Sequence, residues 1–233
     1  MMKKVWPYVV QWLLVLILPV CLVVLNVWAV TGSWFIQWEY GKAGFPKDSY
    51  GFSLEERTRL AEICVEYLAT GADISLLADQ VLSGGEVAFN ERELQHMADV
   101  QFVFRRTLTV GSFAAVAWIG GMVALSFLQG TRKHAVDALL GGGLFTLGLL
   151  VVVGVFMAMS WWEFFSAFHG VFFEEGTWVF LRSDTLIRLF PERFWMDVAV
   201  LVVALLIAEA ITCTALGWGC KRWGQQVDAT SNR

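Results

Sequence analysis

The stretch NERELQHMADV, residues 90–100, is the part of this chain that decides its fold and suggests its chemistry. Asn90 is a preferred residue for the N-cap of a helix, and Glu93 completes the pattern of a capping box. No Gly or Pro follows before Gly111. We therefore predict a helix that begins in polar sequence and continues without a break into the apolar segment after Thr107.

His96 lies between two acidic residues on this predicted helix. Glu93 precedes it and Asp99 follows it at three-residue spacing, so the three side chains share one helix face. An imidazole gives and takes protons near neutral pH, and a flanking carboxylate can orient it. The pattern therefore suggests acid–base catalysis just outside a membrane. The alternative is a solvated helix face with no catalytic role.

The composition indicates an integral membrane protein. Hydrophobic residues make up 57% of the 233 residues, and the net charge is only −4. The sequence has no basic tract, no glycine-rich phosphate loop and no nucleotide-binding fingerprint. We therefore expect an all-α integral membrane protein that has four transmembrane helices and a helical extracellular cap. We expect neither a nucleic-acid partner nor a cofactor.

Apolar segments divide the chain into spans and loops. We treat residues 1–233 as a single membrane domain with outer loops at 31–106 and 160–196. A cleaved signal peptide is the alternative for the first segment, but its apolar region is longer than such peptides usually have. The predicted spans are residues 5–30, 107–128, 135–159 and 197–218.

Basic residues predict the orientation of these spans. Pairs of Lys or Arg lie at 3–4, 132–133 and 221–222, and four spans place all three pairs on one side. The positive-inside rule makes that side cytoplasmic. We therefore expect a multi-pass protein of the cell membrane with both termini in the cytoplasm and both large loops outside.

The first outer loop carries further helix signals. Ser53 and Glu56 form a second capping-box pattern, and Gly71 is expected to end the helix that follows. A short helix is predicted over Ile74–Leu82.

Three features within and beside the spans give separate expectations. His134 falls in the short basic loop and is expected to be solvated. Glu209 lies inside the fourth span, where we expect a structural hydrogen bond or a protonated acid. Glycines along the third span, at 141–143, 148 and 154, are expected to allow close approach of neighbouring helices.

A second stretch, WWEFFSAFHGVFF at residues 161–173, carries the other histidine predicted to face outward, His169. Helical geometry, at about 1.5 Å per residue, places His96 and His169 roughly 15 Å or less beyond the apolar core, so the two can meet. The aromatic residues either anchor an interfacial helix or form a groove for acyl chains. The candidate groove residues are Trp162, Phe165, Phe168 and Phe172.

These stretches also resemble a known family. FNERELQHMADV at 89–100 resembles the first motif of the lipoprotein intramolecular transacylases. FHGVFF at 168–173, Trp178 and DTLIRLFP at 184–191 resemble the second. Gln101 departs from the pattern, where a basic residue is expected. The order of spans and loops also fits, so the resemblance extends over nearly the whole chain.

The resemblance implies a membrane acyltransferase of Gram-positive cell membranes. Its substrate would be a lipoprotein whose N-terminal cysteine carries a diacylglyceryl group and a free amine. The enzyme would move the sn-2 acyl chain to that amine and release a lyso-form lipoprotein. The implied partners are this substrate and membrane lipid, with no obligate protein partner and no metal.

The two family histidines fall on His96 and His169. We predict His96 as the base, oriented by Glu93 or Asp99, and His169 as the group that polarises the oxyanion or protonates the leaving oxygen. The two roles could be reversed. No Ser or Cys nucleophile is needed, because the substrate supplies both the amine and the ester.

Two other classes of function remain open at this point. A metal-dependent membrane hydrolase or protease could use His96, His169 and either Glu93 or Asp99 as ligands, although the sequence has no H-E-x-x-H motif. A non-enzymatic transport or assembly component is the other alternative. Chelator sensitivity would identify the first, and retained biological function in a His96→Ala protein would identify the second.

Overall fold

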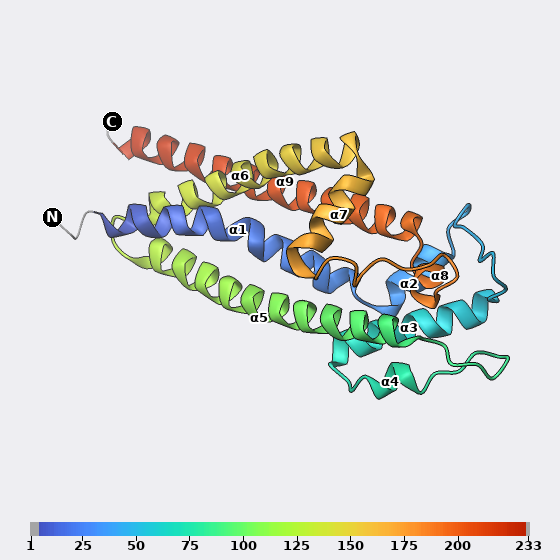
Figure 1. Cartoon of the computed structure of the whole chain (residues 1–233). Helices are drawn as coiled ribbons and strands as arrows, with labels where there is room; N and C mark the ends of the chain where they lie inside the picture. The colour runs from blue at the N-terminus through green and yellow to red at the C-terminus, as the bar shows by residue number, and fades with distance from the viewer. Residues whose placement is uncertain (1–4, 232–233) are drawn as a thin grey trace. The chain divides into compact units, whose positions relative to one another are not determined.

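The computed structural model describes residues 5–231, and this part of the chain is helical apart from turns and loops (Figure 1). Its β structure is an isolated bridge between Val81 and Val87. The prediction of an all-α chain is therefore confirmed. The helices are α1 (Trp6–Val30), α2 (Ser33–Tyr40), α3 (Leu54–Thr70), α4 (Ser75–Ala78), α5 (Glu91–Phe127), α6 (Arg132–Met159), α7 (Trp161–Phe172), α8 (Thr185–Leu189) and α9 (Glu192–Ser231).

Four of the described helices, α1, α5, α6 and α9, are long and apolar enough to cross a membrane. This confirms the predicted four-helix membrane fold. Helix α5 has 37 residues and runs from the polar turns around His96 into the apolar segment, as the absence of early Gly or Pro predicted. His96 lies in the polar turns that precede the apolar part of this helix.

The chain divides into two compact units. Unit 1 consists of the described parts of Met1–Asn26, Thr109–Met159 and Val202–Arg233. Unit 2 consists of Val27–Leu108 and Ser160–Leu201, and it holds both His96 and His169.

Helix packing in unit 1 depends on glycine at two positions of α6. A Cβ atom on Gly142 would lie 2.7 Å from the side chain of Leu18, and one on Gly143 would lie 2.7 Å from the carbonyl oxygen of Ala210. These glycines therefore allow the close approach that the sequence predicted. Gly148 and Gly154 have open space instead, so the prediction was wrong for them.

The ends of the unit 1 helices agree with an even number of crossings. Three features lie at one end of this unit: the start of α1, the connection between α5 and α6, and the last turns of α9 (Figure 1). Arg132 and Lys133 lie at the start of α6 and are exposed there. Lys221 on α9 forms an ion pair with Asp137 on α6, with 2.7 Å between the charged atoms.

His134 is not the solvated loop residue that we predicted. It is only 4% exposed, and its Nδ1 lies 2.7 Å from Oε1 of Gln11. Tyr8 packs edge-on against its ring. The expectation failed because α6 begins at Arg132, so His134 is already in the first helical turn, facing α1.

Glu209 has the hydrogen bond that its position in an apolar helix requires. Nδ2 of Asn26, on α1, donates to Oε2 of Glu209 at 2.8 Å. The same Asn26 amide donates to the carbonyl of Leu22 at 2.9 Å. Pairing within the helix bundle reduces the cost of an acidic group in an apolar environment, and the structural interpretation of Glu209 is confirmed.

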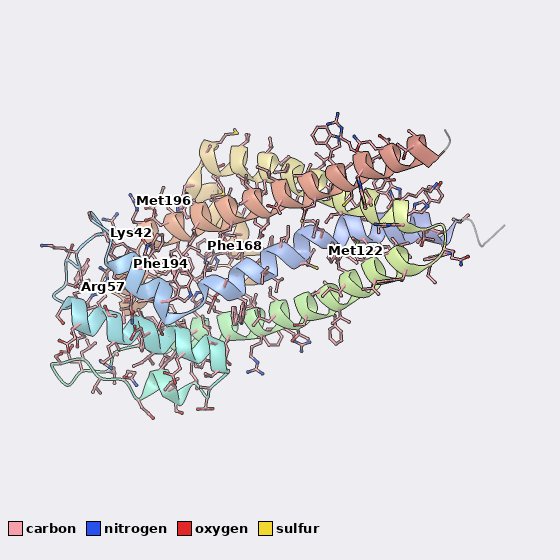
Figure 2. All side chains as sticks on the ribbon, turned by 180° about the vertical axis from the view of Figure 1, so that it is seen from behind. Lys42, Arg57, Met122, Phe168, Phe194 and Met196 are labelled. Carbon is pink, nitrogen blue, oxygen red and sulfur yellow. The ribbon has the colours of Figure 1, made fainter. Side chains whose placement is uncertain are left out.

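Unit 2 has its own hydrophobic core. Helix α3 is central, because α2, α4 and α8 all pack on it. The core includes Phe35, Ile36, Leu60, Cys64, Tyr67, Leu77, Leu189 and Phe194. Arg57 is buried beside this core, and its side chain is visible with that of Phe194 in Figure 2. The hydroxyl group of Tyr40 donates to the carbonyl of Leu189 at 2.7 Å and so joins α2 to α8.

The Ser53 cap formed as predicted, but only half of the capping box exists. The amide of Glu56 donates to Oγ of Ser53 at 3.1 Å. The Glu56 carboxylate instead accepts bonds from the amide and the hydroxyl group of Ser83, each at 2.8 Å. Gly71 ends α3 with a φ of 68°, as expected.

The short helix after Gly71 is shorter than predicted. Helix α4 covers Ser75–Ala78 rather than Ile74–Leu82. The amide of Ala88 donates to the carbonyl of Gln80, and the amide of Leu82 donates to the carbonyl of Glu86, both at 2.8 Å. These bonds take the chain out of the helix and turn it back toward the start of α5.

Candidate active site

A complete capping box fixes the start of α5. The amide of Glu93 donates to Oδ1 of Asn90 at 3.0 Å, and the amide of Asn90 donates to Oε2 of Glu93 at 2.9 Å. The remaining oxygen, Oε1 of Glu93, accepts a 2.7 Å bond from the amide of Leu186 on α8. Glu93 therefore connects α5 to α8 through two backbone amides and is 1% exposed.

Burial raises the pKa of the Glu93 carboxyl group above its usual value. The amide bonds from Asn90 and Leu186 oppose this shift because they stabilise the ionised form. The buried carboxylate thus connects the start of α5 to α8, although the two segments are distant in sequence.

Further contacts hold the segment around α8. Asp184, the N-cap residue of α8, accepts from the amide of Leu181 at 2.8 Å and pairs with Arg92 of α5 at 3.3 Å. Arg188 binds both carboxylate oxygens of Asp48, at 3.0 and 3.1 Å. A two-oxygen pairing of this kind is directional and fixes geometry. The loop between α7 and α8 is therefore anchored at its α8 end.

Helix α7 carries His169 on a face rich in aromatic residues. Ser160 is its N-cap, and Oγ of Ser160 accepts from the amide of Glu163 at 3.3 Å. The ring centroids of His169 and Phe165, one turn apart, are separated by 4.0 Å. Phe168 contacts the His169 ring edge-on at 5.6 Å.

The structure brings His96 and His169 together. Their ring centroids are 6.4 Å apart, and their planes differ by 21°. Phe173 contacts both rings, at 5.1 Å from His96 and 5.6 Å from His169. Phe180 also packs against His96, at 5.3 Å. The two imidazoles thus share an aromatic environment within unit 2.

The hydrogen bond of His169 fixes its tautomer. Nδ1 lies 2.8 Å from the carbonyl oxygen of Phe165. A carbonyl oxygen can only accept, so Nδ1 carries the hydrogen and donates it. In the neutral ring, Nε2 then carries the lone pair and is the nitrogen that can take a proton.

His96 has a different environment. Its Nδ1 is buried and has no hydrogen-bond partner in the described part of the chain. Glu93 bonds the amides of Asn90 and Leu186, while Asp99 accepts from Nε2 of Gln95 at 3.2 Å. These hydrogen bonds of the two acids therefore go to other groups than the His96 ring.

Burial lowers the pKa of both histidines. The pKa of His96 falls to about 4, chiefly by burial and also by the proximity of His169. Burial likewise lowers the pKa of His169, and the bond to the Phe165 carbonyl opposes that shift. Both rings are therefore neutral near pH 7, which is the form in which an imidazole can accept a proton.

The four candidate groove residues lie on or beside this aromatic face. Phe165 and Phe168 contact His169 directly. Trp162 reaches it through Phe165, with centroids 6.3 Å apart, and Phe172 through Phe168, at 5.1 Å. Trp162, Phe168 and Phe172 are exposed, so they offer apolar surface for a ligand.

Trp178 is the site residue that sequence reasoning did not assign a role. Its ring centroid lies 4.7 Å from that of His169. It follows α7 in a turn around Gly176, whose φ is 85°. Its place in the second motif was the one sequence feature that pointed to Trp178. Helical spacing could not predict that the turn at Gly176 brings the indole back to α7.

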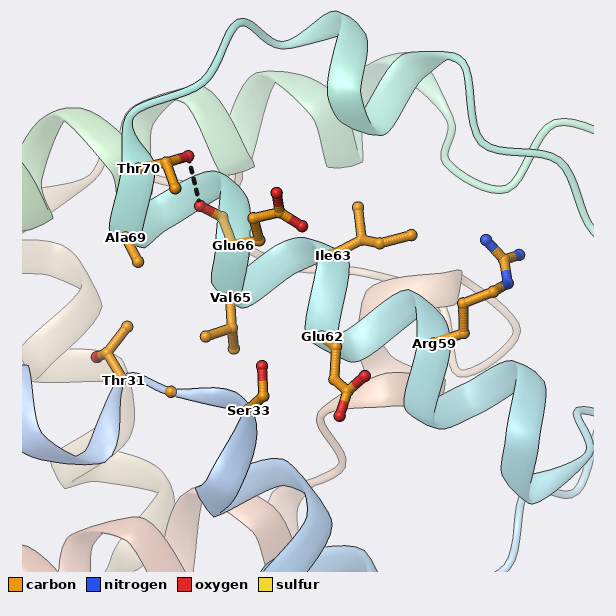
Figure 3. Close-up of a pocket in the computed structure, with 10 residues that line it drawn as sticks. Thr31, Ser33, Arg59, Glu62, Ile63, Val65, Glu66, Ala69 and Thr70 are labelled. Atoms are coloured by element: carbon orange, nitrogen blue, oxygen red, sulfur yellow. Dashed lines mark hydrogen bonds between the residues drawn. The ribbon is translucent and has the colours of Figure 1, made fainter.

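A groove of about 420 Å³ lies elsewhere on unit 2, between the α1–α2 junction and α3 (Figure 3). Its lining includes Thr31, Ser33, Glu62, Glu66 and Thr70. It contains neither histidine, and the hydroxyl group of Thr70 bonds the carbonyl of Glu66 within its own helix. The groove therefore offers no acid–base pair like that of the histidine site.

A metal site would need a ligand set among the described side chains. Within the part of the chain that the structure describes, no three His, Cys, Asp or Glu side chains form a group that could hold a metal ion. The set proposed for the metal-dependent alternative, the two histidines with Glu93 or Asp99, does not form such a group.

These features are those of a multi-pass, all-α membrane protein with a half-buried pair of neutral imidazoles beside exposed aromatic surface. Comparison with known families identifies it further. The model of the lipoprotein intramolecular transacylases matches residues 11–195, and this chain belongs to that family. Its members are membrane acyltransferases, and the expectation drawn from the sequence motifs is confirmed.

Individual relatives agree with this assignment. An uncharacterized protein of Aquifex aeolicus (strain VF5) is 31% identical over 194 residues, which cover 83% of this chain and 86% of the relative. The crystal structure of the lipoprotein intramolecular transacylase of Bacillus cereus has a TM-score of 0.79 at 19% identity, covering 95% of this chain and 98% of that one. A variant of the same protein, with one histidine replaced by alanine, has a TM-score of 0.76 at 18% identity and covers 97% and 98%. These structures share the fold of this chain.

Proposed function

We propose that this chain transfers the sn-2 acyl chain of a diacylglyceryl-modified lipoprotein to the α-amino group of its N-terminal cysteine. The family membership supports this reaction, and the paired histidines supply groups suited to it. Amine and ester belong to one molecule, so the protein has to orient them and move protons. The lyso-form lipoprotein is the product.

The tautomer of His169 supports a role as the base, which reverses our initial assignment. Its Nε2 takes a proton from the amine while the nitrogen attacks the ester carbonyl carbon. The donor bond from Nδ1 to the Phe165 carbonyl stabilises the imidazolium that forms. The tetrahedral intermediate then collapses, the bond between carbonyl carbon and glyceryl oxygen breaks, and Nε2 returns the proton to that oxygen.

His96 acts as a neutral imidazole in this mechanism. Its lowered pKa disfavours the imidazolium form near pH 7, so it is a poor base. A neutral ring N–H can donate to the carbonyl oxygen of the ester while negative charge develops there. The buried and unpartnered Nδ1 of His96 shows that this ring has hydrogen-bonding capacity not used within the described chain.

Glu93 positions the site through the backbone. It connects the start of α5 to α8, and α8 anchors the loop that carries Phe180 onto His96. Asp99 accepts a hydrogen bond from the exposed Gln95 and has no part in this mechanism.

Exposed aromatic residues of α7 provide the surface for the acyl chains. Trp162, Phe168 and Phe172 lie around His169 with their rings partly open. Apolar chains gain free energy on contact with such surface. The substrate is then held at the membrane by its own lipid, and membrane lipid is the only other partner that the mechanism requires.

The site faces outward in this proposal, with both termini in the cytoplasm. Exposed Arg132 and Lys133 lie at the end of unit 1 where α1 begins and α9 ends. The positive-inside rule assigns that end to the cytoplasm.

The histidine pair carries the proposal, and mass spectrometry of lipoprotein N-termini tests it. Cells that make this protein should accumulate lipoproteins with an N-acylated cysteine and one remaining glyceryl ester. Cells without it should retain the diacyl form and a free amine. An unchanged lipoprotein profile in cells that contain the folded protein would contradict the proposed reaction.

A further inference from the structure

A buried hydrogen-bond donor lies beside the histidine pair without a partner. Nε1 of Trp178 is buried and makes no hydrogen bond within the described residues. An indole N–H can only donate, and buried donors are nearly always paired in folded proteins. Its missing partner therefore needs an explanation.

The position of this indole is fixed rather than loose. The amide and the hydroxyl group of Thr177 both donate to the carbonyl of Glu174, at 3.2 and 2.9 Å. Gly176 supplies the left-handed conformation that closes this turn. The Trp178 ring then packs on His169 at 4.7 Å, Phe165 at 6.1 Å and Trp162 at 6.4 Å.

Unpartnered polar atoms gather at His169. Five buried side-chain nitrogen or oxygen atoms lack a partner in the described chain, and they belong to Glu39, Arg57, His96, Trp118 and Trp178. Two of these five belong to rings that contact His169, namely His96 and Trp178. Trp118 is also unpartnered, but it belongs to unit 1 and packs on the core of that unit.

We propose that the indole N–H of Trp178 is a catalytic donor that binds the carbonyl oxygen of the ester being transferred. This inference rests on the proposed acyl transfer. As the bond between amine nitrogen and carbonyl carbon forms, the π electrons of the carbonyl move onto its oxygen, which then accepts from Nε1. When the bond to the glyceryl oxygen breaks, the carbonyl reforms and the hydrogen bond weakens. No other reactant is required.

A fixed donor at this oxygen should act mainly on the transition state. Oxyanion donors contribute because the charge they bind develops during the reaction. Loss of the N–H should therefore lower kcat more than it changes KM. A purely structural indole should show neither effect when its shape is preserved.

The decisive experiment replaces Trp178 with benzothienylalanine, which substitutes sulfur for the N–H and keeps the ring shape. We expect kcat to fall about 10²-fold with little change in KM, as for removal of one oxyanion donor. Trp178→Phe is the second variant and should lose activity to at least the same degree. The matched control places benzothienylalanine at Trp195, an exposed indole of the same unit, and should keep the parental kcat.

The outcomes separate this inference from the proposed reaction. All proteins are assayed on one diacylglyceryl-modified lipopeptide, with thermal unfolding to establish that each is folded. A folded Trp178→benzothienylalanine protein with the parental kcat would overturn the role of Trp178 and leave the reaction intact. A raised KM with unchanged kcat would overturn it as well. A parental protein that forms no N-acylated product would instead overturn the proposed reaction itself.

Discussion

The imidazole rings of His96 and His169 lie 6.4 Å apart, centroid to centroid, with their planes within 21° of parallel. One ring comes from the polar start of α5 and the other from the short aromatic helix α7. The hydrogen bond from His169 to Phe165 leaves Nε2 of His169 as the nitrogen that can take a proton.

Substitution of either histidine should abolish most of the activity. We expect His169→Gln to lose about 10²- to 10⁴-fold in rate, because glutamine can hydrogen-bond but cannot shuttle a proton. His96→Ala should lose about 10²- to 10³-fold, because it removes a donor to the developing oxyanion. If the rings act as a unit, the double variant should be little worse than either single one. His134→Gln, in unit 1, is the control and should keep the parental rate per folded molecule. Near-parental formation of lyso-form lipopeptide by folded His169→Gln would rule out its role as the base.

The two site histidines should stay neutral well below the usual histidine pKa. The chain has three histidines, so their ring signals can be assigned by NMR from single substitutions. His96 should titrate near pH 4, and His169 should titrate below 6.5, the usual value. Ring signals of the folded protein that titrate near 6.5 for both residues would contradict the burial argument.

The lowered pKa values of His96 and His169 should also make the stability of the folded protein depend on pH. Below pH 6.5 the unfolded chain binds protons at these histidines that the folded chain does not bind until a lower pH. Folding stability should therefore fall as pH decreases from 6.5 toward the folded-state pKa values and should be unaffected by these groups above 6.5. Comparison of the midpoints of thermal unfolding for the parental and His96→Gln proteins across this range isolates the contribution of His96.

Loss of the Glu93 carboxylate should destabilise unit 2. Glu93→Ala leaves the amides of Asn90 and Leu186 without their buried acceptor, and we expect a loss of about 3 kcal/mol in unfolding free energy. Glu66→Ala, at an exposed position of α3, should change it by less than about 0.5 kcal/mol. Denaturation in detergent measures both. Equal stability of the two variants would show that the connection to α8 is dispensable.

Asp99→Asn should have little effect on the reaction rate. Asp99 accepts a hydrogen bond from Gln95, and an asparagine oxygen can accept the same bond. Steady-state kinetics should give a kcat within about threefold of the parental value, as for substitutions outside the catalytic contacts. A loss comparable to that of His169→Gln would restore Asp99 as the residue that orients a histidine.

Topology is testable by thiol labelling of intact cells. In a background with Cys220 replaced, Gly84→Cys and Glu175→Cys should react with a membrane-impermeant reagent, because both positions are exposed in unit 2. Lys133→Cys should react only after permeabilisation. Labelling of Lys133→Cys in intact cells would invert the proposed orientation.

The fold class, the four long apolar helices and the uninterrupted course of α5 could all be predicted from the sequence. These features follow from local properties: apolar length, helix caps and the absence of helix breakers between Asn90 and Gly111. The sequence also predicted the histidine pair, because each ring stands at a similar distance along the chain from an apolar segment.

The contacts of the individual site residues depend on the tertiary structure. Glu93 looked like a partner of His96 from its spacing, but its free oxygen bonds the amide of Leu186, which lies 93 residues away in the chain. Trp178 reaches His169 only because the turn at Gly176 folds back on α7. Spacing along a helix shows which side chains share a face, whereas contacts between distant segments depend on how loops close. For that reason the tautomer of His169 and the unpartnered donor of Trp178 could be found only in three dimensions.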